Sequence, residues 1–500
     1  MRRGIDAAWS GLTLPNAVGV LVYVALFFTL LQWVPDQFMP LFGDHAALIF
    51  AVGVIGLWRY LWWLVHLVRS RIYQHRVFPQ MREQAEALWE SGWRPPRVHY
   101  IIATRNEHPD TTRSVVEAIV GEQRRTGIPA RLFIVGEPGD ERTIVERLID
   151  IAADCDIEAK FIRAIQPGKR LALGLALRAV SRSGAEANDP IVFMDGDSFP
   201  EPGLLRRCLP LFALHPRLDA LTTDERALVI GPKWMQRLID LRFAQRHLTM
   251  QSHALSGMVI TLTGRLSIFR ARAALRPELI RLVEADHLQH WLWGRFRFLS
   301  GDDKSTWYAL LTQPRGTLLL YVPDAVAWTV ERIDGNGVGR MKQNLMRWSG
   351  NMLRNGARAI ALGPRRVGLF IWWCLIDQRL AIWTSLAGPV AAVLAVYSLG
   401  SGVLVAYLLW VLVTRFVLAC VMWVYSGRID ASYPLMIYLG QQITAMVKVY
   451  AIFRLAQQRW FNRGDQKAGA GGKGLAWFQR GMAFYLTSMS CVLLVAALAI

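Results

Sequence analysis

Long apolar segments stand near both ends of this 500-residue chain and enclose a more polar middle. Two of them, residues 17–34 and 46–68, are each long enough to cross a hydrocarbon core of about 30 Å. Three more lie near residues 380–399, 403–425 and 482–500. With 53% hydrophobic and only 19% charged residues, the chain holds more apolar surface than one soluble core can bury. The sequence therefore predicts an integral membrane protein with a soluble domain between two groups of spans.

Basic residues are distributed unevenly around the predicted spans. The connector between the first two, residues 35–45, has no Lys or Arg, whereas basic residues precede the first span and follow the second. The positive-inside rule then places both flanks, and the polar middle, in the cytoplasm. The formal net charge of +19 could suggest a nucleic-acid partner, but no nucleic-acid motif accompanies it. Membrane-flanking charge, a phosphate-bearing substrate and an acidic product explain the excess better.

The segment 434–453 is apolar but carries Gln441, Gln442 and Lys448. If it crossed the membrane, the basic loop 454–480 would lie outside the cell, against the positive-inside rule. We therefore expect a re-entrant or interfacial helix here and a cytosolic loop after it. The predicted organisation is two transmembrane helices in residues 1–75, a cytosolic α/β domain in residues 94–335, interfacial amphipathic helices in residues 336–380, and transmembrane and interfacial helices in residues 380–500.

Within residues 94–335, short apolar strands alternate with amphipathic helices. Alternation over this length predicts an α/β domain with a mainly parallel sheet. Sheets of this kind bind ligands in the crevice outside the carboxyl ends of their strands. The polar residues that follow each predicted strand are therefore the first place to search for a functional site.

The five cysteines carry no recognisable pattern. They are scattered without Cys-x-x-Cys spacing, and Cys374, Cys420 and Cys491 lie in strongly apolar runs. Disulfide frameworks and structural zinc sites in short sequence motifs both depend on close, regular spacing. The sequence therefore predicts neither of them here.

The stretch "IVFMDGDS" is an apolar strand that ends in Asp195, Gly196 and Asp197. Two carboxylates two positions apart, with a glycine that lets the backbone turn closely, can hold a divalent cation through oxygen ligands. That cation would in turn carry a diphosphate. An Asp-x-Asp motif is frequent by chance, but at a strand end of an α/β domain we favour the functional interpretation.

Other charged side chains follow the neighbouring predicted strands. Glu107 comes just after the first strand, and Glu137 and Asp140 come after the second, where carboxylates can accept hydrogen bonds from a nucleotide's base and ribose. Helix N-capping is a nearly equal alternative for each of them. Lys169 and Arg170 open a later helix, where they could bind phosphate or simply flank the helix.

The stretch "GRFRFLSGDDKSTW" places Asp302 and Asp303 side by side, where their charges repel, and a surface turn is the ordinary explanation. The order of motifs offers another. A strand-end acid, an Asp-x-Asp, a later acidic pair and an Arg-Trp on an amphipathic helix, flanked by spans, resembles the processive family 2 glycosyltransferases: cellulose, chitin and hyaluronan synthases. The stretches "WRYLWWLVH", "LTGRLSIFRAR" and "VEADHLQHWLWGRFRFLSGDDKSTW" are most similar to the mannuronan synthases of bacterial alginate biosynthesis.

The resemblance implies a GT-A-like domain that performs an inverting transfer. Asp303 would be the general base that takes the proton from the acceptor hydroxyl, and Asp302 would raise its pKa or orient it by way of Lys304. Arg347 would bind the diphosphate, with Asp195 and a metal, and Trp348 would stack on the acceptor sugar. A cationic interfacial helix with an aromatic anchor is the structural alternative for the Arg-Trp pair.

The stretch "QRWFNRG" resembles a family motif that closes over the nucleotide diphosphate. The resemblance assigns Trp460 and Arg463 to the donor and makes residues 454–480 a cytosolic gating-type loop. This role agrees with the charge argument, which also places that loop in the cytosol.

A basic set is expected near the acceptor site: Arg242, Arg246, His247, Arg265 and Arg270. A uronic acid donor and a polyanionic product need cations for their carboxylates, so Arg246 and Arg265 are candidates for binding the sugar acid or the polymer. An ordinary helix-surface arginine is the alternative for any one of them. His247 is expected to be a hydrogen-bonded structural residue rather than a ligand.

The resemblance also implies a substrate and partners. The donor would be GDP-mannuronic acid, the cofactor Mg²⁺ or Mn²⁺, and the product poly-β-1,4-mannuronate, which is moved across the bacterial inner membrane. A cyclic di-GMP-binding partner subunit of the PilZ type and an export complex are implied as well. A related synthase that uses a UDP-sugar is the main alternative, and an inactive, transferase-like transport scaffold is a second.

Overall fold

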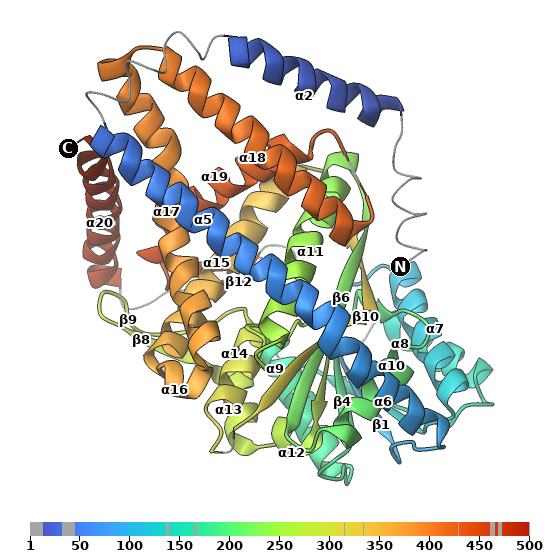
Figure 1. The fold of residues 1–500 in the computed structure, drawn as a ribbon. Helices are drawn as coiled ribbons and strands as arrows, with labels where there is room; N and C mark the ends of the chain where they lie inside the picture. The colour runs from blue at the N-terminus through green and yellow to red at the C-terminus, as the bar shows by residue number, and fades with distance from the viewer. Residues whose placement is uncertain are drawn as a thin grey trace.

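An eight-stranded sheet forms the centre of one half of the molecule, and long helices form the other half (Figure 1). The computed structural model describes residues 14–32, 46–136, 140–164, 168–314, 316–333, 335–428, 430–460, 466–468 and 473–499. The strands of the sheet are β1 (Val98–Ala103), β2 (Ala130–Gly136), β3 (Ile157–Arg163), β4 (Pro190–Asp195), β5 (Ser198–Pro200), β6 (Leu218–Ile230), β7 (Leu266–Arg270) and β10 (Leu318–Arg332).

The order of the strands across the sheet is β3-β2-β1-β4-β7-β6-β10-β5. Strands β1 to β4 pair in parallel, as do β6 and β10, whereas β7 is antiparallel to β4 and β6, and β5 is antiparallel to β10. The predicted mainly parallel sheet is therefore confirmed. Ala103 at the end of β1 pairs with both Val135 and Asp195, so the carboxyl ends of three strands meet at one edge.

The central strands are buried because their sequences are apolar nearly throughout. All six residues of β1 and the first five of β4 are buried. Parallel strands that helices cover on both faces have this continuous pattern. The helices of this half are α6 (Phe78–Glu90), α7 (Pro109–Thr126), α8 (Asp140–Ile151), α9 (Lys169–Arg182), α10 (Leu204–Leu214), α11 (Lys233–Ala254), α12 (Ala271–Ala274), α13 (Pro277–Ala285) and α14 (Asp302–Leu311). A two-stranded hairpin, β8 (His287–His290) and β9 (Gly294–Arg297), follows α13.

The long helices include four segments that are long and apolar enough to cross a membrane, judged within the described residues: Leu369–Tyr397, Gly402–Ser426, Tyr433–Ile452 and Leu475–Ala499. They belong to α17 (Leu369–Leu399), α18 (Gly402–Ser426), α19 (Tyr433–Ile452) and α20 (Lys473–Ala499). The other elements are α2 (Leu14–Gln32), α5 (Ala46–Ile72), the π-helix η1 (Tyr73–Val77), α15 (Gly337–Ala361), α16 (Pro364–Val367), β11 (Gln458–Trp460) and β12 (Gln466–Ala468).

One helix boundary differs from the sequence prediction. The span expected at residues 380–399 belongs to a helix that already begins at Leu369. The added part of the helix includes Asp377, and Arg59 of α5 lies 2.7 Å from its carboxylate, so the charge is paired inside the helix group. The segment expected to be re-entrant or interfacial is the continuous helix α19, whose mean hydropathy of 1.2 over 18 residues is sufficient for a span by composition. Its orientation stays a prediction.

Helices α11 and α15 join the two halves of the molecule, and α11 lies between the sheet and the long helices in Figure 1. Apolar residues of α11, including Leu241 and Leu248, share a core with Leu418 and Met422 of α18. At the end of α5, the Ser70 hydroxyl donates to the Gln251 side chain of α11 at 2.6 Å. The edge of the sheet where the parallel strands end is thus fixed against the helix group.

Candidate active site

A cavity of about 790 Å³ lies at the carboxyl ends of the parallel strands. Its walls come from the loop after β1, the start of α9, the ends of β4 and β10, and helices α11, α14 and α15. Ten of the residues predicted for the site line it: Glu107, Lys169, Asp195, Asp197, Arg246, Arg265, Asp302, Asp303, Arg347 and Trp348. Residues separated by more than 200 positions in the sequence therefore meet in one cavity.

The lysine that opens α9 joins two of the predicted carboxylates. The Lys169 ammonium lies 2.6 Å from Asp195 Oδ1 and 2.9 Å from Asp302 Oδ2. A Cβ on Gly264 would lie 2.8 Å from the Lys169 Nζ, so the glycine leaves the space that this ammonium occupies. Burial disfavours the charged form of Lys169, but Asp195 and Asp302 outweigh burial and raise its pKa. The lysine therefore forms ion pairs with both the Asp195-Gly-Asp197 stretch and α14.

The two carboxylates after β4 have different surroundings. Asp197 Oδ1 accepts hydrogen bonds from the hydroxyls of Ser198 and Thr329, each at 3.2 Å. Burial is the largest cause that raises the pKa of Asp195, and the negative charges of Asp197 and Asp302 add to it against the opposing charge of Lys169. The backbone can turn here because Gly196 has no Cβ, which would lie 2.8 Å from the Thr104 hydroxyl.

The adjacent aspartates of the sequence occupy the first turn of α14, after Gly301 in the left-handed conformation with φ of +86°. Negative charge is favoured at a helix N-terminus because the first backbone N–H groups there have no partner within the helix. Asp302 lies toward Lys169, and Asp303 Oδ2 accepts a 3.3 Å hydrogen bond from the Thr261 hydroxyl. The helix start, rather than an exposed turn, is what accommodates the pair.

The pKa values of the two aspartates shift in opposite directions. Burial opposes the charged form of Asp302, but Lys169 and Arg170 outweigh it and lower its pKa. Burial first, and the charge of Asp302 second, raise the pKa of Asp303. Two carboxyl groups with separated pKa values are typical of acid–base sites. Lys304 lowers the pKa of Asp303, although its own Nζ donates to the Ile260 carbonyl oxygen at 2.7 Å.

The predicted sugar-acid residue Arg265 is already paired with two glutamates. Its guanidinium lies 3.0 Å from Glu225 Oε2 and 3.2 Å from Glu331 Oε1. Arg246 lies 3.4 Å from the other oxygen of Glu225. Sequence reasoning missed both glutamates, although Glu331 follows the same strand-end rule that selected Asp195. A ligand carboxylate would therefore compete with Glu225 and Glu331 for these arginines.

Trp348 lies on α15 beneath an arginine of α11. The guanidinium carbon of Arg242 is 4.5 Å from the centroid of the Trp348 ring, within the range of a cation–π contact. Burial, reinforced by the charge of Arg265, lowers the pKa of Arg242 to about 10. Arg347, the residue before Trp348, donates a 3.4 Å hydrogen bond to the Asn344 side chain. The Arg-Trp motif thus faces the same cavity as Asp303.

The loop after β1 is shaped by an acid that the sequence reasoning did not select. Glu141 accepts from the backbone N–H of Glu107 at 2.7 Å and from the Thr104 hydroxyl at 3.0 Å. Its neighbour Asp140 is the first residue of α8, and the side chain of Asp140 lies outside what the structure describes. Trp460 ends the short strand β11, and its side chain likewise lies outside what the structure describes. The predicted donor residues Glu137 and Arg463 lie outside the residues that the structure describes.

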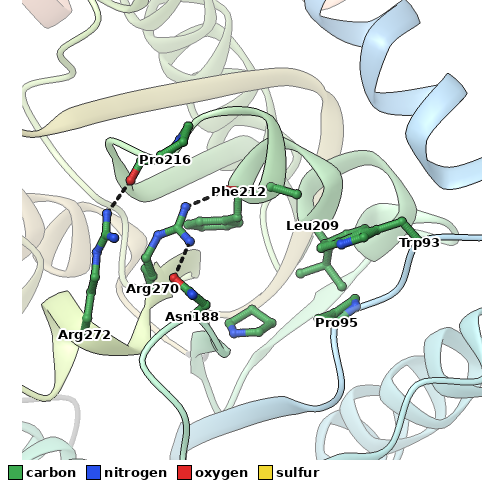
Figure 2. Close-up of a pocket in the computed structure, with 10 residues that line it drawn as sticks. Trp93, Pro95, Asn188, Leu209, Phe212, Pro216, Arg270 and Arg272 are labelled. Atoms are coloured by element: carbon green, nitrogen blue, oxygen red, sulfur yellow. Dashed lines mark hydrogen bonds between the residues drawn. The ribbon is translucent and has the colours of Figure 1, made fainter.

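Two arginines expected near ligands have structural roles instead. Arg170 is buried and donates to the carbonyl oxygens of Val283 and Ser300, each at 3.0 Å, so the phosphate interpretation is wrong in this structure. Arg270 stands at the opposite end of the sheet from Asp195, since it pairs with Pro190 at the start of β4. It lines a separate cavity of about 380 Å³, where Figure 2 shows it hydrogen-bonded to Asn188 and Phe212.

His247 is a structural residue, as the sequence predicted. Its Nδ1 lies 2.8 Å from the Tyr321 hydroxyl and 2.9 Å from Asp224 Oδ1. Its Nε2 lies 2.7 Å from the side-chain nitrogen of Gln251. Both ring nitrogens are therefore engaged by neighbouring side chains behind the cavity.

Comparisons with known proteins agree with this arrangement. The family model described as "Glycosyltransferase like family 2" matches residues 95–351. "Glycosyltransferase alg8" of Pseudomonas syringae pv. tomato is 35% identical over 90% of this chain and 91% of its own length. The protein of the same name from Azotobacter vinelandii is 35% identical over 91% of each chain.

A solved structure of a mannosyltransferase from Pyrobaculum calidifontis, in complex with GDP-Man and Mn²⁺, is also similar. Its TM-score is 0.48 at 17% identity, covering 77% of this chain and 97% of the other. The assignment rests on the family model and the two relatives, which together cover the cavity and most of the helices. The chain therefore belongs to glycosyltransferase family 2, enzymes that transfer a sugar from a nucleotide donor to an acceptor.

Proposed function

We propose that this protein is a processive, inverting synthase that transfers mannuronic acid from GDP-mannuronic acid to a growing poly-β-1,4-mannuronate chain. The α/β domain would act in the cytoplasm, and the helices after α15 would carry the polymer across the bacterial inner membrane. The observation that carries the proposal is the convergence of Asp303 with Asp195 and Asp197 in one cavity, in a chain 35% identical to two proteins named Glycosyltransferase alg8.

Asp303 has the properties of a general base for this transfer. Its carboxylate would take the proton from the acceptor hydroxyl while that oxygen attacks the anomeric carbon on the face opposite the nucleotide. The glycosidic bond forms as the bond to the diphosphate breaks, and GDP leaves. The raised pKa of Asp303 supports this role, because a stronger base removes a hydroxyl proton more readily. Trp348 would hold the acceptor sugar by stacking.

The cavity carries more cationic than acidic side chains, which suits a donor with phosphates and a sugar carboxylate. The cations among its lining residues are Arg105, Lys169, Arg242, Arg246, Arg265, Lys304, Arg332, Arg340 and Arg347. Its carboxylates are Glu107, Asp195, Asp197, Glu225, Asp302, Asp303 and Glu331. Arginine binds carboxylates and phosphates with paired hydrogen bonds. A neutral hexose donor would leave part of this charge unused.

The carboxylates after β4 fit a divalent cation. Burial raises the pKa of Asp195, and Asp197 and Asp302 are close enough to raise it further, while Lys169 forms ion pairs with Asp195 and Asp302. An excess of buried carboxylate oxygens of this kind is the donor set that Mg²⁺ and Mn²⁺ prefer. A cation held by Asp195 and Asp197 would neutralise charge on the departing diphosphate.

Replacing Asp197 tests the metal site directly. Asp197→Asn is expected to raise the Mn²⁺ concentration needed for half-maximal GDP binding by about tenfold or more, because the site loses one anionic ligand. Titration calorimetry of the full-length protein in nanodiscs, with Mn²⁺ varied at fixed GDP, measures the change. Glu158→Gln, on the half-exposed edge strand β3 outside the cavity, is the matched control and should behave as wild type. Equal metal dependence in both variants would contradict the assignment.

The donor is tested by label incorporation into polymer. Membranes that contain the chain, a cyclic di-GMP-binding partner of the PilZ type, the export complex, cyclic di-GMP and Mg²⁺ are given GDP-mannuronic acid, UDP-glucose, UDP-N-acetylglucosamine or UDP-glucuronic acid. We expect high-molecular-weight product from the GDP donor alone, degraded by a mannuronate lyase. Product only from a UDP donor would be consistent with the proposed transfer mechanism but would rule out GDP-mannuronic acid as the donor. No product from any donor would favour an inactive transport scaffold.

A further inference from the structure

Three soft ligand groups from three separate helices meet where the α/β domain contacts the long helices. They are His66 of α5, His253 of α11 and Cys374 of α17, and one ligand atom from each lies within 4.8 Å of the other two. All three side chains are buried, and none lines the active-site cavity. Sequence reasoning could not identify this cluster, because its members are more than 100 residues apart.

Hydrogen bonding orients His66 toward the cysteine. Its Nδ1 lies 2.9 Å from the Ser252 hydroxyl, and its Nε2 lies 4.0 Å from Cys374 Sγ. When Nδ1–H donates to Ser252, the lone pair of Nε2 is directed to the side of the thiol. Metal-binding histidines usually have their second nitrogen fixed by such a partner.

His253 supplies a buried nitrogen that the protein itself does not satisfy. The residue is only 3% exposed, so water does not reach its Nδ1. This atom also has no hydrogen-bond partner within the described part of the chain. Buried polar atoms without a partner are rare and costly, so each one requires an explanation. A neutral imidazole with a free lone pair is the form that binds metal ions.

The spacing of the ligand atoms is close to that of a metal site. Metal–sulfur and metal–nitrogen bonds of about 2.3 and 2.0 Å place neighbouring ligand atoms about 3.5 to 3.8 Å apart. The observed 4.0 Å between His66 Nε2 and Cys374 Sγ needs only a small side-chain adjustment.

We propose that His66, His253 and Cys374 bind one soft transition-metal ion, with Cu(I) favoured over Zn(II). Thiolate and imidazole ligands select these two ions. Cu(I) with one thiolate is neutral overall, whereas Zn(II) would leave a buried positive charge beside Arg69. Binding forms one metal–sulfur and two metal–nitrogen bonds and releases the thiol proton. The ion would fasten α5 and α17 to α11, and so fix the α/β domain on the helix group.

Metal titration of the full-length protein in nanodiscs tests this site. Cu(I), added anaerobically, and Zn(II) are titrated separately in competition with a chromogenic chelator, and Co(II) is used in parallel as the optical probe for a zinc site. We expect one ion per chain, with a sulfur-to-metal charge-transfer band for Co(II) if it binds. Cys374→Ser and His253→Gln should each lower the affinity at least tenfold. Cys420→Ser is the matched control, since Cys420 lies on α18 outside the cluster.

Thermal unfolding separates loss of the site from loss of the fold. The added metal should raise the unfolding temperature of wild type and Cys420→Ser and leave both site variants unchanged, because an ion stabilises only a protein that binds it. Tighter binding of Zn(II) than Cu(I) would overturn the ion assigned. No uptake of either ion, or equal uptake by Cys374→Ser, would overturn the site. None of these readouts depends on sugar transfer, so they stand apart from the proposed function.

Discussion

Asp303→Asn is expected to lower the rate of sugar transfer by about 10² to 10⁴, because the amide cannot accept the proton of the acceptor hydroxyl. Nucleotide binding should stay close to wild type, since Asp303 accepts its hydrogen bond from Thr261, whereas Lys169 pairs with Asp195 and Asp302. Label incorporation measures the rate, and calorimetric GDP binding by the same preparation is the control for folding. A variant that keeps more than a tenth of the wild-type rate would rule out Asp303 as the base.

The pH dependence gives the same assignment a second readout. The base must be ionised, so transfer should fall as the pH drops through the raised pKa of Asp303. The charge of Lys304 lowers that pKa, and Lys304→Met should therefore move the acid limb of the rate profile to higher pH. Lys160→Met, on β3 far from the cavity, is the matched control and should leave the profile unchanged. An unmoved acid limb in Lys304→Met would exclude Asp303 as the titrating group.

The sequence predicted the elements of the site because strand ends have a simple geometry. Once "IVFMDGDS" is assigned as a buried strand, its Asp195 must lie at the sheet edge beside the residues that follow β1, as the pairing of Ala103 with Asp195 confirms. The pair Asp302 and Asp303 needed the family resemblance, because nothing in its local sequence distinguishes a helix start in a cavity from an exposed turn. The functional interpretation of the Arg-Trp motif likewise depended on the family resemblance, which rests on the order of the motifs before it.

Sequence reasoning could not identify which side chains from distant segments contact one another. Arg170 and Lys169 are adjacent in the sequence, yet successive positions on a helix face about 100° apart. One therefore enters the cavity while the other is buried against Val283 and Ser300. Arg265 and Arg270 lie in different places for a related reason. Arg265 comes just before the five-residue strand β7, and Arg270 is its last residue. Only the pairing of β7 with β4 decides which arginine reaches the site.

The first turn of α14 is held by a buried polar network on the side away from the cavity. Asp286 is fully buried and accepts two hydrogen bonds from Arg358, at 2.7 and 2.8 Å, and one from the Ser305 hydroxyl. Arg170 donates to the same hydroxyl at 2.8 Å. Ser305 is two residues after Asp303, so this network connects α13, α9 and α15 to the start of α14.

Arg358→Met is expected to destabilise the protein by about 3 to 5 kcal/mol, because it leaves the carboxylate of Asp286 buried without its countercharge. Adding Asp286→Asn should recover part of that loss, since the double variant no longer buries an unpaired charge. Arg142→Met is the control: its pair with Glu146 is more than half exposed at Arg142 and should contribute within about 0.5 kcal/mol. Chemical unfolding in a fixed detergent, followed by tryptophan fluorescence, compares the four proteins. A double variant less stable than Arg358→Met alone would mean that Asp286 stabilises α14 without its charge, through hydrogen bonding to Ser305.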